Sequence, residues 1–190
     1  MKSQRTIKYG SEAPVEEQRI CTGCGFCCDG TLFVNAGLNP GERGHLPEKI
    51  EQAGFSKGGK DYFRLPCNYF SGKCMIYDRK RADICSSFRC QLLKNFAVGK
   101  VTMNEALSVV HGAIEMRTML LDDFCRHTGL NRGMTFRQLL TEIGKMQKSA
   151  FPEETNSVET ESLIARSNIF EAMLIKYFRS AGDFEKLVMK

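Results

Sequence analysis

The sequence lacks long hydrophobic runs, and no stretch of its 190 residues approaches the roughly 18 consecutive apolar residues of a membrane-spanning helix. Polar residues follow Met1 to Arg5, where a secretory signal would have an apolar segment. These absences argue against a membrane protein and a secreted one, so we expect a protein of the cytoplasm. A chain of this length suits one domain, or one domain with a helical extension.

The familiar motifs of nucleotide-binding and hydrolytic enzymes are also missing. The sequence has no P-loop, no GxGxxG and no GxSxG, and it lacks the C-x3-C-x2-C spacing of radical enzymes that use S-adenosylmethionine. Histidine is scarce, with three residues in all, and His45 and His111 stand alone, which is more typical of loop and helix residues than of metal ligands. The sequence therefore leaves open whether the protein is an enzyme.

Cysteine, by contrast, is abundant and unevenly placed. Eight of the nine cysteines lie between Cys21 and Cys90, and only Cys125 follows. Because the reducing cytosol does not maintain disulfides, a high cysteine count there usually indicates metal binding. Cys125 lies on a predicted helix away from the others, and we expect it to be an ordinary buried cysteine.

The sharpest pattern is the segment 21–28, which reads CTGCGFCC. Bacterial ferredoxins use the same C-x2-C-x2-C spacing to bind three corners of a four-iron cluster. Gly23 and Gly25 can adopt positive φ and direct backbone N–H groups at the sulfurs. Cys28 directly follows Cys27, and because adjacent side chains diverge, we expect Cys28 to serve a neighbouring second site or to bridge two sites.

Four further cysteines complete the predicted metal ligands, which are Cys21, Cys24, Cys27, Cys28, Cys67, Cys74, Cys85 and Cys90. Eight thiols can form two tetrathiolate sites, or one iron–sulfur cluster beside a set of structural thiols. The glycines and the three cysteines at a spacing of two favour a four-iron (4Fe–4S) cluster with a redox or accessory role over zinc.

The alternative is a zinc-stapled binding module whose basic segment, residues 61–100, contacts nucleic acid or an acidic protein. This segment holds eight basic and three acidic side chains, and so accounts for the formal net charge of +5. A tetrathiolate zinc site or an oxidised four-iron cluster with four thiolates carries about −2. We therefore favour compensation of thiolate charge over nucleic-acid binding, and we expect a protein partner that the sequence does not identify.

The cysteines and their neighbours resemble the CxxCxxCC cysteine-cluster family, described as a zinc- or iron-chelating domain. The resemblance covers residues 18–92 and rests on segment 21–28 followed by Cys67, Cys74-Met75-Ile76-Tyr77-Asp78, Arg81, Cys85, Phe88 and Cys90. Ala82 and Ser86 stand where the family usually has proline and arginine. A flagellin lysine methylase carries a related cysteine domain with a four-iron cluster. This resemblance implies one function, the support of a modification reaction such as lysine methylation.

Two residues near the cysteines, Arg81 and Tyr77, are predicted to lie beside the cofactor's thiolate ligands. An arginine near a thiolate cluster can donate hydrogen bonds and raise its reduction potential, and we assign this role to Arg81. Tyr77 is expected to pack over the site.

The predicted fold is small, mixed and mainly α. A loop-rich, metal-stapled cysteine domain, residues 18–92, precedes a helical region, residues 100–190, which packs on it as a bundle of about three helices. Capping boxes at Thr102 and Thr135 begin two helices, which Gly129 and Pro152 end, and a third runs over residues 158–181. We expect short strands at residues 31–34 and 62–65 and a short helix at residues 47–53.

Overall fold

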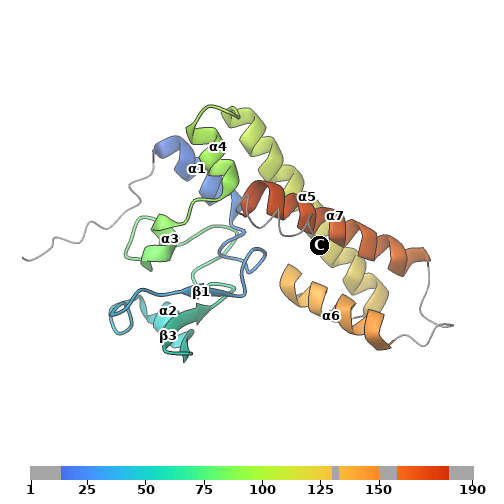
Figure 1. The fold of residues 1–190 in the computed structure, drawn as a ribbon, viewed down its shortest axis with the longest axis horizontal. Helices are drawn as coiled ribbons and strands as arrows, with labels where there is room; N and C mark the ends of the chain where they lie inside the picture. The colour runs from blue at the N-terminus through green and yellow to red at the C-terminus, as the bar shows by residue number, and fades with distance from the viewer. Residues whose placement is uncertain (1–13, 130–132, 150–157, 180–190) are drawn as a thin grey trace, which may run out of the picture.

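The computed structural model describes residues 14–129, 133–149 and 158–179. Within them the chain is mixed and mainly α, as the sequence predicted: seven helices accompany one three-stranded sheet (Figure 1). The elements in chain order are α1 Val15–Cys24, β1 Asn35–Gly37, α2 Glu48–Gln52, β2 Gly54–Lys57, β3 Lys60–Arg64, α3 Asp83–Ser87, α4 Gln91–Ala97, α5 Met103–Thr128, α6 Phe136–Ser149 and α7 Val158–Phe178.

Helix α5 begins and ends where the sequence predicts. The hydroxyl of Thr102 accepts a hydrogen bond from the N–H of Glu105 at 3.3 Å, and the Glu105 carboxylate accepts one from the N–H of Thr102 at 2.7 Å. At the other end Gly129 has a φ of 68°, and its N–H donates to the carbonyl of Cys125. The predicted capping box and glycine stop are therefore confirmed.

Replacing Thr102 with alanine should lower the free energy of unfolding by about 1 kcal/mol, because an orphan N–H of the first turn loses its acceptor. Urea denaturation of the full chain measures this change. Thr118→Ala is the matched control: its exposed hydroxyl only bonds to the carbonyl of Ile114 within the helix, so we expect a loss below about 0.5 kcal/mol. Equal losses in the two variants would contradict a stabilising cap.

Helices α6 and α7 also follow the prediction. The N–H of Gln138 donates to the hydroxyl of Thr135 at 3.2 Å, and the Gln138 side chain accepts from the N–H of Thr135 at 2.7 Å, so the second box is present. The expected end of α6 at Pro152, and residue 181 as the end of α7, lie outside the described residues.

The main hydrophobic core joins the helical half to the first half of the chain. Buried residues of α5, α6 and α7 form one cluster with Ile20, Phe26, Leu32, Leu92 and Leu93. The ring of Phe26 is 0 % exposed and packs edge-on against Phe178 and Phe170, with centroids 5.2 and 6.3 Å apart. Figure 1 shows α1 and α4 beside the first turns of α5. The two predicted regions thus share a core.

A second, smaller cluster lies under the sheet. Strand β3 is central and pairs antiparallel with β1 and β2, and Phe63 of β3 is buried with Ile50, Ile76 and Ala82. The predicted strand at 62–65 and helix at 47–53 correspond to β3 and α2. Figure 1 shows this sheet and α2 apart from the long helices.

The predicted strand at 31–34 is wrong, because the strand begins only at Asn35. The N–H of Thr31 donates to the Asp29 carboxylate at 2.8 Å, and the N–H of Leu32 donates to the carbonyl of Phe26 at 3.0 Å. These donors close the turn that follows the cysteine motif, so they do not pair with a neighbouring strand.

Three helices of the first half, α1, α3 and α4, have no counterpart in the prediction, which treated this half as loop-rich. Helix α1 has a proline cap without a side-chain hydrogen bond, and its first turns are polar, so it carries neither a capping box nor a clear apolar stripe. Among the described residues, every helix is too short or too polar to cross a membrane.

Candidate metal centre

The cysteine motif begins inside a helix and continues in a turn. Cys21 and Cys24 lie in the last turn of α1, where a spacing of three places both side chains on one face. Gly25 ends the helix with a φ of 70°, as expected, and an added Cβ would come within 2.6 Å of the Phe70 ring. Gly23 is helical, so the expectation of positive φ there is wrong. The N–H of Gly23 therefore belongs to the last turn of α1.

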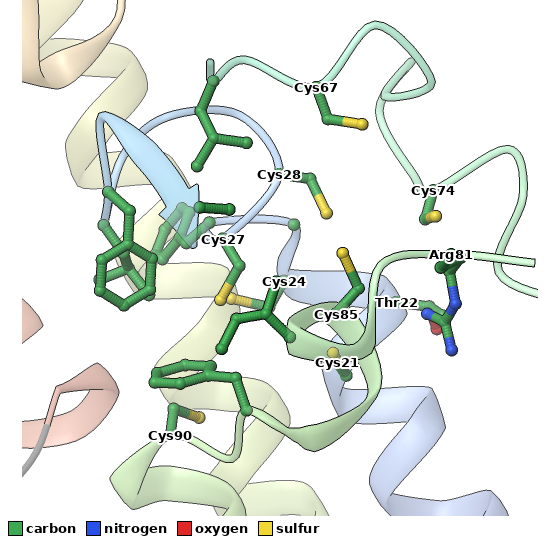
Figure 2. Close-up of a pocket in the computed structure, with 18 of the residues that line it drawn as sticks. Cys21, Thr22, Cys24, Cys27, Cys28, Cys67, Cys74, Arg81, Cys85 and Cys90 are labelled. Carbon is green, nitrogen blue, oxygen red and sulfur yellow. The ribbon is translucent and has the colours of Figure 1, made fainter. Parts of the chain in front are cut away.

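All eight cysteines of the first half line one cavity of about 290 Å³ (Figure 2). Helix α1 and the turn after it supply four thiols, the loop between β3 and α3 supplies two, and α3 and the start of α4 supply Cys85 and Cys90. Apolar side chains, among them Phe26, Leu32 and Leu92, also line the cavity. Cys125 is buried in α5 and does not line it.

The eight thiols lie around the cavity wall. All nine cysteines are within the described residues, and none of them forms a disulfide. In that part of the chain no three His, Cys, Asp or Glu side chains already stand around one ion-binding point. The donor set consists of soft sulfur ligands, which suit zinc and iron–sulfur clusters. Occupation by a single ion would therefore draw side chains inward.

Loss of hydration inside the cavity sets the protonation of most of these thiols, although seven of the eight cysteines are half-buried and Cys85 is exposed. Loss of hydration raises the pKa of Cys21 to about 11 and that of Cys85 to about 12, with neighbouring sulfurs adding to the effect. Burial likewise raises the pKa of Cys24, Cys27 and Cys90. These groups hold their protons at neutral pH unless a cation replaces them.

Cys74 differs from the others because its thiolate is stabilised. The neighbouring Cys28 thiol, a backbone N–H at Ile76 and the charge of Arg81 lower the pKa of Cys74, against the effect of burial. The interaction with Cys74, together with burial, raises the pKa of Cys28. Of the two thiols, Cys74 is therefore the one that loses its proton more readily.

Arg81 and Tyr77, predicted from the sequence to lie beside the thiols, both line the cavity. The guanidinium of Arg81 lies 4.2 Å from the centre of the Tyr77 ring and donates a 3.4 Å hydrogen bond to the Ser86 hydroxyl. Its charge also acts on Cys21 and Cys85. Tyr77 thus contacts the arginine that faces the sulfurs.

The thiols belong to two packing environments. Cys21, Cys24, Cys27 and Cys90 pack against the main core. Cys67 and Cys74 pack against the small cluster under the sheet. One backbone hydrogen bond, from the N–H of Cys67 to the carbonyl of Cys28 at 2.7 Å, joins the loop after β3 to the end of the motif.

Two ion pairs that sequence reasoning missed hold the frame of the cavity. Glu17 is 4 % exposed, and its carboxylate forms an ion pair with Arg89 at 2.5 Å. This pair joins α1 to the residue before Cys90. Asp29, next to Cys28, pairs with Arg117 of α5. The two residues of each pair are far apart in the chain. A single charged residue in the sequence does not indicate which distant residue it pairs with.

Comparisons with known protein families, curated proteins and solved structures find no match. The resemblance to the CxxCxxCC cysteine-cluster family therefore stays a prediction.

Proposed function

We propose that this chain is a cytoplasmic metal-binding protein that carries a four-iron cluster and has a redox or accessory role. The observation that carries the proposal is the cavity: the eight cysteines of the first half line it, and Cys125 does not. Thiols gathered around one cavity can bind metal together once they release their protons to it.

The size of the cavity favours a cluster over a lone ion. Its volume of about 290 Å³ is many times the roughly 10–15 Å³ that a cavity needs to hold one water. A four-iron cluster has eight core atoms and presents a separate iron to each thiolate, so it suits thiols that are spread over a wall. The C-x2-C-x2-C spacing of Cys21, Cys24 and Cys27 adds to this argument.

Cys90 is the best candidate for the fourth ligand of this cluster. It packs on the same core as the three motif cysteines, and its sulfur acts on the pKa of each of them. It is also the N-cap of α4, where the N–H groups of Leu92 and Leu93 oppose the effect of burial on the pKa of its thiol. A helix N-terminus favours the thiolate form that a metal needs.

A bound four-iron cluster supplies one-electron transfer, and such a centre can support a modification reaction such as lysine methylation. The chain's own residues would surround it: Phe26 and Leu92 present apolar side chains to the cavity, and Arg81 places a positive charge beside the thiols. That charge favours the reduced, more negative form of a cluster.

The basic segment fits this proposal better than it fits the alternative, a zinc-stapled module that contacts nucleic acid or an acidic partner. Arg81 faces the cavity, and Arg89 pairs with the buried Glu17. Two of the segment's eight basic side chains therefore serve the site itself. An electron-transfer partner protein remains part of the proposal.

Anaerobic purification of the full chain, followed by iron, zinc and sulfide analysis, tests the proposal. We expect about four iron and four sulfide per chain and a broad visible absorption that bleaches with dithionite. A colourless protein that contains zinc and no iron would overturn it and favour the zinc module.

A further inference from the structure

We propose that the outer face of the three-stranded sheet binds single-stranded nucleic acid, with a base stacked on Tyr62 and the phosphates bound by three basic side chains, Lys57, Lys60 and Arg64. The inference goes beyond the proposed function and does not depend on which metal the cysteines hold. It rests on the side chains that the strand register places together on this face.

The register of the sheet divides its side chains between two faces. In the β2–β3 pair, Phe55 lies opposite Tyr62, and Lys57 lies opposite Lys60. Strand β1 adds the residues that are paired with Tyr62 and Arg64. Side chains alternate along a strand, and directly opposed residues share a face. The outer face therefore carries Asn35, Gly37, Phe55, Lys57, Lys60, Tyr62 and Arg64.

The opposite face of the sheet is the buried one. Phe63 packs there in one cluster with Ile50 of α2. Asp61, the one acidic residue of the three strands, lies on this face too, and its carboxylate accepts a hydrogen bond from the hydroxyl of Ser56 at 2.5 Å. The strands thus place cations without a carboxylate on the outer face, in a part of the fold that Figure 1 shows apart from the long helices.

The basic side chains of the outer face are exposed and lack a counter-charge. Within the described residues, none of Lys57, Lys60 and Arg64 forms an ion pair with a carboxylate. Gly58 and Gly59, with φ of 58° and 72°, make the tight turn that sets the two lysines directly opposite each other. Like charges in this position destabilise a hairpin, and a bound anion would offset the repulsion.

Aromatic rings on the same face supply a second kind of contact. The rings of Phe55 and Tyr62 stack with their centroids 5.5 Å apart, and the Arg64 guanidinium lies 5.0 Å from the centre of the Phe55 ring. On the β1 side, Tyr62 lies opposite Gly37. Within the described part of the chain, a Cβ added to Gly37 would have only an edge atom of the Tyr62 ring within 4 Å, its own chain neighbours apart. The missing side chain leaves room beside Tyr62 for a flat base.

The combination of free cations and a ring beside a glycine selects single-stranded nucleic acid. Its phosphates match the three cations, and its unpaired bases can stack on an aromatic ring. A duplex keeps its bases stacked on one another and so cannot use Tyr62. An acidic protein segment would match the cations, but it lacks the flat group that the space beside Tyr62 accommodates.

This face differs from the basic segment 61–100, because Lys57 and Lys60 precede that segment. It also borders the cysteine cavity, whose lining includes the three residues of β1, Asn35, Ala36 and Gly37. Nucleic acid stacked between Tyr62 and β1 would therefore lie next to the cavity.

Fluorescence polarisation of the full chain, purified anaerobically, with a labelled oligouridine of about 12 nucleotides tests the inference. Lys57→Glu combined with Lys60→Glu should weaken binding by at least about tenfold. The matched control is Lys100→Glu combined with Lys176→Glu, which reverses two exposed charges in the helical half and should weaken it less than about threefold. Tyr62→Ala should weaken binding by about 5- to 150-fold, whereas Tyr62→Phe, which keeps the ring, should bind like the parent.

Three results would each overturn the inference: equal affinity for oligouridine and for a duplex of the same length, equal losses in the two charge-reversed variants, or unchanged binding by Tyr62→Ala. Polyglutamate that competes as well as unlabelled oligouridine would assign the face to an acidic protein and overturn it too. If Tyr62→Ala does not fold, the lysine variants and the duplex comparison decide. Metal analysis of the parent is independent of all these measurements, so failure of the proposed function is recognised separately.

Discussion

Cys24→Ser should abolish the four-iron cluster, with loss of most of the iron, the sulfide and the visible absorption. Cys24 lies on the same face of α1 as Cys21 and lines the cavity with it. A serine hydroxyl is a poor ligand for iron at this position because it must lose its proton in a buried place.

The matched control is Cys125→Ser, which removes a buried thiol that does not line the cavity. Its iron and sulfide content should equal that of the parent. Circular dichroism of both variants checks that the helices remain. Full iron occupancy in Cys24→Ser would show that the ferredoxin-like interpretation of segment 21–28 is wrong, even if iron were bound elsewhere in the protein.

Phe26→Ala should lower the free energy of unfolding by about 3–5 kcal/mol, as expected for the loss of a fully buried phenyl ring. The ring lies between the second and third cysteines of the motif in sequence, and in space it packs against Phe170 and Phe178 of α7. Because it fixes the turn that carries Cys27, the variant should also lose iron. Urea denaturation and metal analysis measure the two effects.

Phe55→Ala provides the comparison, since Phe55 stacks on Tyr62 across the sheet, far from the helical core. A half-buried cross-strand pair of this kind contributes at most about 1 kcal/mol. Similar losses in Phe26→Ala and Phe55→Ala would mean that the cysteine region does not depend on the core it shares with the helices.

The parts of the fold that could be predicted are those whose signals are local. The boxes at Thr102 and Thr135 and the glycine at 129 act within one helical turn, so the sequence places α5 and the start of α6 correctly. The gathering of eight cysteines at one cavity could be predicted from their spacing in the first half of the chain.

The parts that could not be predicted depend on contacts between distant residues. Helix α1 has no side-chain cap, and it is held by Ile20 in the core and by the pair of Glu17 with Arg89. The shift of the first strand to Asn35 results from the use of the N–H groups of Thr31 and Leu32 near the motif. Neither effect is visible in a window of neighbouring residues.

Helix α3 has a consequence for the kinetics of the site. None of its five residues is buried and Cys85 is itself exposed, so α3 covers this side of the cavity only partly. Displacement of this turn breaks few apolar contacts and is a local opening far smaller than global unfolding. If the site holds metal, chelators and incoming ions would have a short route to the sulfurs on this side, and we expect the opening of α3, with both hydrophobic clusters intact, to set the lifetime of the bound ion.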